Sequence, residues 1–274
     1  MLRSLYSGVS GMRGFQTKLD VIGNNIANVN TTGFKAGRVM FKDILSQTVS
    51  GVTAPEEGAK GGVNAKQIGL GVSISAIDTV HTPGSAMTTN VPTDLRIDGD
   101  GFFAVSTDGT TDSMFLTRAG NFTIDASRQL VNADGMFVLS TEGGPITLEE
   151  DDTAFSISQN GEVITTKSDG TTNVAAVIAV AKVTNPAGLE KVGGNLYRST
   201  ANSNIDPEID LGAAIPNDPT TGTGAIIAGQ LEMSNVDLTS EFTEMIVAQR
   251  GFQSNSRIIT TSDEILQEVV NLKR

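Results

Sequence analysis

The sequence predicts an α+β fold, in which N- and C-terminal helices form a coiled-coil-like pair and the centre is an antiparallel all-β domain. Apolar residues recur every three or four positions at both ends of the 274-residue chain, which is the spacing of one helical face. The middle has short β-rich stretches separated by Asn-Gly and Asp-Gly pairs, which are signals for hairpin turns. Charge divides the chain similarly: the net charge is +5 over residues 1–42, −14 over 43–231 and −3 over 232–274.

The first predicted element is an amphipathic helix over residues 1–33. Its apolar face includes Leu5, Met12, Phe15, Leu19, Ile22 and Ile26. Four glycines interrupt it, at positions 8, 11, 14 and 23, and each lowers helix stability by about 1 kcal/mol relative to alanine. We therefore expect the helix to be marginal alone and to need a partner. Its basic, acid-poor composition is also typical of a transit peptide, which remains an alternative.

The matching element is a C-terminal amphipathic helix over residues 231–274. Its apolar stripe includes Phe242, Met245, Phe252, Ile259 and Leu266. Asn235 or Asp237 can cap its start through a side-chain oxygen. Opposite net charges favour pairing of the two terminal helices within one chain. A single pair would still leave apolar surface exposed, which indicates an interaction surface. Copies that pack through a contact that does not close form a helical filament.

Between the helices we expect an extended Gly/Ser-rich linker arm over residues 34–75 and a β-rich domain over residues 76–230. A second linker-like stretch covers residues 199–224. Hairpins are predicted at 129–140, around Asp134-Gly135, and at 155–165, around Asn160-Gly161. Residues 95–106 and 114–125 are predicted to be two further strand pairs, each punctuated by glycine.

Composition excludes several classes of function. The chain has no cysteine, so disulfides, thiolate nucleophiles and Cys-ligated zinc are ruled out. A net charge of −12 argues against nucleic acid as a partner, because a surface that follows phosphates needs a basic stripe. The longest apolar run, residues 174–181, is too short to span a bilayer. No signal-peptide pattern opens the sequence, so we expect no membrane insertion and either retention or export by another route.

The candidates for catalysis or metal binding are weak. His81 is the single histidine and lies in a turn-like stretch, so we expect a surface or loop residue rather than a triad member. Four consecutive acids at 149–152 suggest a solvated turn more than paired catalytic carboxylates. Asp98 and Asp100 begin like a calcium loop, but Phe102 stands where the third ligand belongs. Gly69 and Gly71 do not open a helix, so a dinucleotide site is not supported. We predict no enzyme activity, cofactor or metal, although a secreted carbohydrate-active enzyme and a monomeric adhesin remain alternatives.

Three segments resemble one family. The N-terminal LYSGVSGM and DVIGNNIANVNTTGFK (20–35), the central DLRIDGDGFFAV with RAGNFTIDASRQLVNADGMFVL (94–139), and the ending at 234–274 are similar to bacterial flagellar rod, hook and hook-associated proteins. GFQSNSR within the last segment resembles the hook version. The opening MLRSLYSGVSGM and the short chain resemble the distal rod instead. We therefore expect a flagellar hook subunit, a flexible universal joint that transmits torque, with the stiff distal rod as the alternative.

The resemblance implies a hollow helical homopolymer with the terminal helices inside and the β-domains outside. It also implies termini that are disordered in the monomer and fold on assembly. Export would use the flagellar type III apparatus, without a cleaved signal peptide, to the extracellular hook. Implied partners are further copies of the chain, the distal rod protein, the hook–filament junction protein and the hook cap.

The stretch NNIANVNTTGFK (24–35) places four asparagines at the expected end of the first helix. They could be a stop signal, a ligand site or a register device in a packed interface. We expect Asn24, Asn25 and Asn28 to face away from Ile22 and to bond to neighbouring copies, while residues 30–33 end the helix and Phe34 anchors the turn. The predicted polymerisation interface comprises Leu5, Met12, Phe15, Leu19, Ile22, Asn24, Asn25, Ile26, Asn28, Phe34, Phe242, Met245, Phe252, Ile259 and Leu266.

Overall fold

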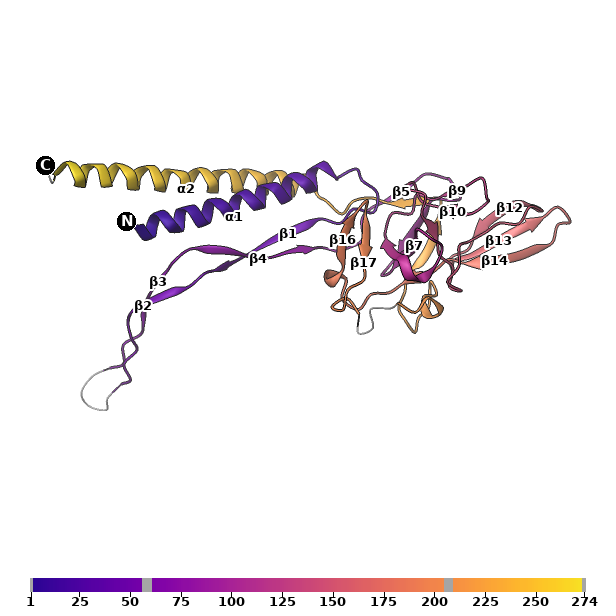
Figure 1. Ribbon diagram of the computed structural model, residues 1–274, viewed down its shortest axis with the longest axis horizontal. Coiled ribbons are helices and arrows are strands. Elements are labelled where there is room, and N and C mark those ends of the chain that lie inside the picture. The colour runs from indigo at the N-terminus through magenta and orange to yellow at the C-terminus, as the bar shows by residue number, and fades with distance from the viewer. Residues whose placement is uncertain (1, 56–60, 205–208, 273–274) are drawn as a thin grey trace. The chain divides into compact units, whose positions relative to one another are not determined.

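The computed structural model describes residues 2–55, 61–204 and 209–272 (Figure 1). The chain divides into two compact units. The first, here called the helical unit, comprises Met1–Ala27, Gly37–Thr79 and Asp237–Arg274. The second, the β unit, comprises Asn28–Ala36 and Val80–Val236. The chain therefore passes between the units four times.

The two long helices of the helical unit are α1, Leu2–Ala27, and α2, Leu238–Leu272. They lie side by side and antiparallel, as Figure 1 shows, so the predicted pairing of the terminal helices is confirmed. Lys18 Nζ of α1 lies 3.0 Å from Glu244 Oε2 of α2, which is the contact of opposite charges that the sequence favoured. Both helices are shorter than predicted, since α1 ends before the asparagine-rich turn and α2 begins after residue 237.

Local chemistry explains where α2 begins. The Asp237 carboxylate accepts the N–H of Thr239 at 3.0 Å, and its carbonyl accepts the N–H of Glu241 at 3.0 Å, so Asp237 rather than Asn235 caps the helix. Among the described residues, no helix combines the length and the apolar character that crossing a membrane requires.

A ribbon of paired strands completes the helical unit. It is made of β1 (Gly37–Asp43), β2 (Ser46–Ser50), β3 (Lys66–Gly69) and β4 (Val72–Thr79). β1 pairs with β4 and β2 with β3, both antiparallel. The linker expected over residues 34–75 is thus largely a β-ribbon. The high Gly and Ser content hid the apolar pairs across the ribbon, Val39 opposite Ile77 and Phe41 opposite Ile74.

In its described residues, the β unit contains the remaining strands and three short 3₁₀ helices. The strands are β5 (Ala86–Thr88), β6 (Leu95–Asp98), β7 (Phe102–Ser106), β8 (Met114–Thr117), β9 (Thr123–Ile124), β10 (Leu130–Val131), β11 (Phe137–Val138), β12 (Asp152–Ile157), β13 (Glu162–Lys167), β14 (Thr172–Val177), β15 (Val180–Ala181), β16 (Glu190–Gly193), β17 (Leu196–Arg198), β18 (Ala225–Ala228) and β19 (Gln230–Glu232). The 3₁₀ helices are η1 (Thr111–Ser113), η2 (Pro186–Gly188) and η3 (Leu211–Ala213).

The main sheet has the strand order β16-β17-β8-β7-β11-β10-β9, and β15 also pairs with β7. β12, β13 and β14 form a separate three-stranded antiparallel sheet (Figure 1). β18 pairs with β6, and β19 pairs with β5. The pairings between named strands are antiparallel, so the predicted central antiparallel β region is confirmed.

β7 is the centre of the hydrophobic core. All five of its residues are buried. Phe103 and Val105 belong to one apolar cluster, whereas Phe102 and Ala104 belong to another. Because side chains alternate across a strand, the two clusters lie on opposite faces of the main sheet. This explains why the sequence of β7 is apolar at consecutive positions rather than at alternate ones.

Both predicted hairpins are present. The Gly161 N–H donates to Ser158 O between β12 and β13, and the Gly135 N–H donates to Asn132 O between β10 and β11. The strand pairs predicted at 95–106 and 114–125 are wrong in their partners, because β6 pairs with β18 and β9 with β10. The stretch 199–224 is not a free arm in its described part, since Leu211 and Ala214 are buried in the core.

Candidate functional site

α2 carries two apolar stripes on different sides. Met245 and Ile259 are half-buried, and Ala248 and Ser262 are buried. We call these residues, with the half-buried Leu266, the inner seam of α2. Their steps of three, eleven, three and four residues keep them on one side of a helix with 3.6 residues per turn. A Cβ built on Gly8 of α1 would lie 3.4 Å from Ile259 Cγ1, so α1 covers this seam.

The second stripe of α2 faces outward. It comprises Val247, Ile258, Ile265 and Val269, which are 41–58% exposed, and we call it the outer stripe. Steps of eleven, seven and four residues again place these side chains on one side of the helix. Nothing in the described part of the chain covers them. A contiguous exposed apolar stripe of this kind marks a surface that a partner buries.

The residues of the predicted interface therefore separate into several environments. Phe242, Phe252 and Asn24 are exposed; Ile22, Phe34 and Asn25 are buried; Leu5, Met12, Phe15, Leu19, Ile26, Asn28, Met245, Ile259 and Leu266 are half-buried. The structure places the seam residues within the chain, between α1 and α2. The sequence could not separate the seam from the outer stripe, because both have helical spacing and apolar composition.

The helix glycines have a packing role that propensity alone did not reveal. Gly8, Gly11 and Gly14 are buried. A Cβ on Gly11 would lie 2.7 Å from Asn255 Nδ2 of α2, and one on Gly14 would lie 2.9 Å from the Phe41 ring of β1. Across the helix pair, a Cβ on Gly251 would lie 2.6 Å from the Phe15 ring. The glycines thus let the two helices and the ribbon approach closely, at the expense of intrinsic helix stability.

Asn25 does not have the orientation expected from the sequence. It is 2% exposed and lies on the buried side of α1 with Ile22. Its amide nitrogen donates to Gly37 O at 2.9 Å and to Glu241 Oε1 at 3.0 Å, and its amide oxygen accepts the Gly37 N–H at 2.9 Å. The side chain therefore joins α1, β1 and α2 within one chain. The expected outward orientation of Asn25 is therefore wrong, and its described hydrogen-bond partners, Gly37 and Glu241, lie within the chain.

We predict that Asn25→Ala destabilises the helical unit by about 2–4 kcal/mol, because it leaves a buried backbone donor and acceptor without partners. Gln16→Ala, at an exposed position of the same helix, is the matched control and should change stability by less than about 0.5 kcal/mol. Urea unfolding followed by far-UV circular dichroism measures both. Equal effects of the two substitutions would show that Asn25 does not join these elements.

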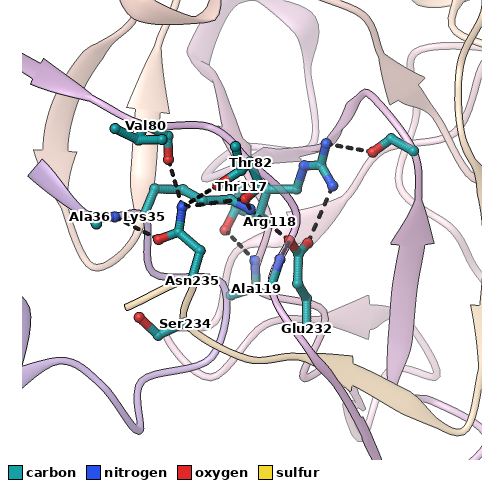
Figure 2. Close-up of polar contacts among 12 residues, drawn as sticks. Lys35, Ala36, Val80, Thr82, Thr117, Arg118, Ala119, Glu232, Ser234 and Asn235 are labelled. Carbon is teal, nitrogen blue, oxygen red and sulfur yellow. Dashed lines mark hydrogen bonds and ion pairs between the residues drawn. The ribbon is translucent and has the colours of Figure 1, made fainter. Parts of the chain in front are cut away.

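A cluster of three buried charges lies in the β unit. Lys35 and Glu232 are each 1% exposed and Arg118 is 4% exposed. Lys35 Nζ lies 2.6 Å from Glu232 Oε1, and Arg118 Nη1 lies 3.2 Å from Oε2. In Figure 2 the lysine and the arginine converge on the same carboxylate. Arg118 Nη2 also donates to Gly99 O at 2.8 Å. The cluster joins the segment after α1, the loop after β8 and strand β19.

In this cluster burial opposes the charged forms of Lys35 and Glu232, and the opposite charges of their partners favour them. Burial lowers the pKa of Lys35, and the Glu232 carboxylate opposes that shift. For Glu232, burial alone would raise the pKa, but the charges of Arg118 and Lys35 and its hydrogen bonds outweigh it and hold the pKa below its usual value. Two buried cations share one buried anion, so removal of the carboxylate would leave both uncompensated.

A second polar group holds the chain beside this cluster. The Asn235 side chain accepts the Ala36 N–H at 2.8 Å, and donates to Val80 O at 2.8 Å and to Thr82 Oγ1 at 2.9 Å (Figure 2). We call these four residues the Asn235 clamp. Ala36, Val80 and Val236, which follows Asn235, are boundary residues of the β unit. The clamp therefore fixes, within this unit, three of the four places where the chain enters or leaves it.

Sequence reasoning missed the charge cluster. Lys35, Arg118 and Glu232 each stand alone among apolar or small residues, as in GFK, TRAG and LEM, and the pattern of a single charge in such a setting does not separate a buried ion from a surface one. One sequence feature could have indicated the cluster: a glycine lies two residues from Lys35 and another lies two residues from Arg118. Gly33 and Gly120 allow backbone approaches that a side chain would prevent.

The residues considered as catalytic or metal-binding candidates do not gather into a site in the described part of the chain. Glu149 forms an ion pair with Lys167 whose side chains are 62% and 29% exposed, and Asp98 lies beside Arg96 at 3.3 Å. Across the described ranges, no group of three or more His, Cys, Asp or Glu residues is placed to hold a metal ion. His81 lies in a loop, as predicted.

The start, middle and end of the chain each match a family model of flagellar rod or hook proteins. Residues 5–35 match a family described as flagella basal body rod protein, residues 96–165 the flagellar hook protein FlgE/F/G D1 domain, and residues 227–272 the flagellar basal body rod FlgEFG protein C-terminal region. The chain is 56% identical over 277 residues to the flagellar basal-body rod protein FlgG of Bacillus subtilis (strain 168), covering 100% of both chains.

Two further relatives, from one species, are a rod protein and a hook protein. The flagellar basal-body rod protein FlgG of Borreliella burgdorferi is 38% identical over 277 residues, and the flagellar hook protein FlgE of that species is 30% identical over 452 residues; both alignments cover 100% of each chain. Paired terminal helices with an outward apolar stripe are features of a structural subunit built into an assembly. The chain belongs to the flagellar basal-body rod and hook protein family, and is an axial structural subunit rather than an enzyme.

Proposed function

We propose that this protein is a subunit of the flagellar rod, the stiff drive shaft of the basal body, and specifically of its distal part. The supporting observation is the match in length. Rod relatives align over 277 positions, whereas the Borreliella hook relative requires 452. A chain of 274 residues has no room for the additional segment of the hook relative. The distal rod, the alternative at the level of sequence, therefore replaces the hook as the main interpretation.

The proposal changes the expected location and partners. A rod subunit belongs to the basal body rather than to the extracellular hook. Further copies of the chain and neighbouring axial proteins remain partners, and export through the flagellar type III apparatus remains part of the proposal. The hook cap and the hook–filament junction protein belonged to the hook interpretation and are left out.

Copies of the chain would assemble through the helical unit. The outer stripe of α2 offers apolar surface that a neighbouring copy can bury. The ribbon offers more: Leu45, Val49 and Ile68 are 49–65% exposed, and a two-stranded ribbon is marginal in water unless something packs on it. Burial of both surfaces between copies would hold each subunit at several points, which is what a shaft that transmits torque without bending requires.

Electron microscopy of basal bodies from cells that lack this gene separates the two axial roles. A rod subunit predicts short rods with no hook beyond them. Complete rods without hooks would overturn the rod assignment in favour of the hook, and intact hooks would overturn both.

We predict that Ile258→Asp and Ile265→Asp, placed in the outer stripe, abolish polymerisation while changing the unfolding free energy of the monomer by less than about 1 kcal/mol, because both side chains already face solvent. The matched control is Ile259→Ala in the inner seam, which should destabilise the helix pair by about 1–3 kcal/mol. Motility of complemented cells and chemical unfolding of the purified chain measure these effects. Normal rods built from the aspartate variants would refute an assembly role of the outer stripe.

A further inference from the structure

His81 lies at the centre of the Asn235 clamp. It stands between Val80 and Thr82, and the Asn235 side chain bonds to both of them. Lys35 Nζ also donates to Thr82 O at 2.8 Å. Val80 and Thr82 are the chain neighbours of His81. A displacement of the His81 ring therefore moves residues that bond to Asn235 in the clamp and to Lys35 in the charge cluster.

The imidazole packs against two buried aromatic rings, which also contact each other. Its centroid lies 5.7 Å from that of Phe102 and 5.5 Å from that of Tyr197, both in edge-to-face geometry. Phe102 is 3% exposed and Tyr197 is 1% exposed. Burial raises the pKa of the Tyr197 phenol to about 12, so this neighbour supplies no negative charge at neutral pH. The setting suits a neutral ring and opposes a charged one.

The charges that face the ring come from every element packed around it. Lys35 lies in the segment after α1, Arg118 in the loop after β8 and Lys191 in β16, and all three repel a proton on the ring. The Glu232 carboxylate of β19 is engaged by Lys35 and Arg118. The backbone of Pro186 favours the protonated ring. Burial, followed by the three cations, lowers the pKa of His81 from 6.5 to about 4.

We propose that His81 is an acid-sensitive switch of the β unit: protonation of its imidazole adds a positive charge beside Lys35, Arg118 and Lys191, and opens the Asn235 clamp. The neutral ring keeps Val80 and Thr82 in place for Asn235 and Lys35. The ring is half-buried against Phe102 and Tyr197. The charged ring moves away from these rings and the three cations toward solvent, and it takes the segment 80–82 with it. The clamp is closed at neutral pH and opens on acidification.

The sign follows from the two protonation states. The pKa of His81 is lower in the folded chain than in the unfolded chain, so the unfolded chain binds more protons between pH 6.5 and about 4. The stabilisation is fully present above pH 6.5 and is lost as the pH falls through this window. As the pH falls through this window, the contribution of His81 to the folding equilibrium constant decreases by between about 10-fold and about 300-fold.

Two measurements on the full chain test the proposal. His81 is the single histidine, so its Cε1–H proton gives one resolved NMR titration, which should have a midpoint near 4. Hydrogen exchange at the Ala36 and Val80 amides should lose at least about 10-fold in protection between pH 7 and 4.5, after correction for intrinsic rates.

His81→Phe keeps an aromatic ring against Phe102 and Tyr197 but cannot be protonated, so its protection at Ala36 and Val80 should stay constant over the same pH range. An NMR midpoint near the ordinary value of about 6.5 would overturn the proposal, as would an equal loss of protection in His81→Phe. If that variant does not fold, the titration of the unmodified chain decides alone. None of these measurements requires polymerisation, so their outcome is independent of the rod assignment.

Discussion

Glu232→Gln is expected to destabilise the β unit by about 3–5 kcal/mol, the range for removing one partner of a buried ion pair. The substitution preserves shape but leaves Lys35 and Arg118 buried without an anion. Urea unfolding at pH 7 measures the change. Adding Lys35→Met, which removes one of the two unpaired cations, should recover at least about 1 kcal/mol of the loss.

The matched control is Glu190→Gln, which breaks an ion pair of similar length in the same unit. Its partner is Arg198 at 2.6 Å, but the two side chains are 54% and 59% exposed, so the effect should not exceed about 1 kcal/mol. If Glu232→Gln is as mild as this control, the buried cluster does not stabilise the fold as we describe.

The same substitution has a pH signature. The pKa of Glu232 is lower in the folded chain than in the unfolded chain, so its stabilisation is present above the unfolded value of about 4.5 and is lost as the pH falls through the folded pKa. The stability difference between the unmodified chain and Glu232→Gln should therefore be largest near neutral pH and shrink below pH 4.5. A difference that is constant across this range would contradict the electrostatic explanation.

Gly33→Ala is expected to destabilise the chain by more than about 3 kcal/mol. Gly33 has φ +68°, and a Cβ there would lie 2.5 Å from Ala119 N and 2.7 Å from Arg118 C. Both are backbone atoms next to the charge cluster, so no side-chain rotation relieves the conflict. The Gly33 N–H also donates to Glu232 O at 2.8 Å, so a shift of this segment moves the cluster.

Gly23→Ala is the control of opposite sign. Gly23 lies within α1, and a Cβ there meets nothing within 4 Å, so alanine should stabilise the chain by about 1 kcal/mol through helix propensity alone. Thermal and urea unfolding of both variants distinguish the two cases. A Gly33→Ala chain with unmodified stability would mean that the segment after α1 does not pack as described.

The elements that could be predicted from sequence are those with a local signal. Helical periodicity located α1 and α2, and the Asn160-Gly161 and Asp134-Gly135 turns located two hairpins, because helix faces and tight turns depend on residues close in sequence. The ribbon within residues 37–79 was missed because its strands pair across a long stretch of the chain, and its Gly and Ser content masked the apolar residues that pair across it.

The site could be predicted only in part, for a physical reason. Whether Asn25 turns inward or outward depends on Gly37 and Glu241, and the sequence does not say which backbone groups will need a partner. The charges of Lys35, Arg118 and Glu232 are separated by more than 80 residues at each step, so only the tertiary fold brings them together. Apolar residues of α2 were recognised, but the choice between seam and outer stripe depends on where α1 lies.

Photo-cross-linking from position 258 in assembled basal bodies tests the central claim most directly. Ile258 belongs to the outer stripe and its neighbour Ile259 to the inner seam. Successive side chains of an α-helix point about 100° apart, so a photoreactive side chain at each position reports on a different side of the helix. Position 258 should cross-link one copy of the chain to another and give a ladder of multiples, whereas position 259 should cross-link α2 to α1 within one copy. Absence of cross-links between copies from position 258 in intact basal bodies would contradict assembly through the outer stripe.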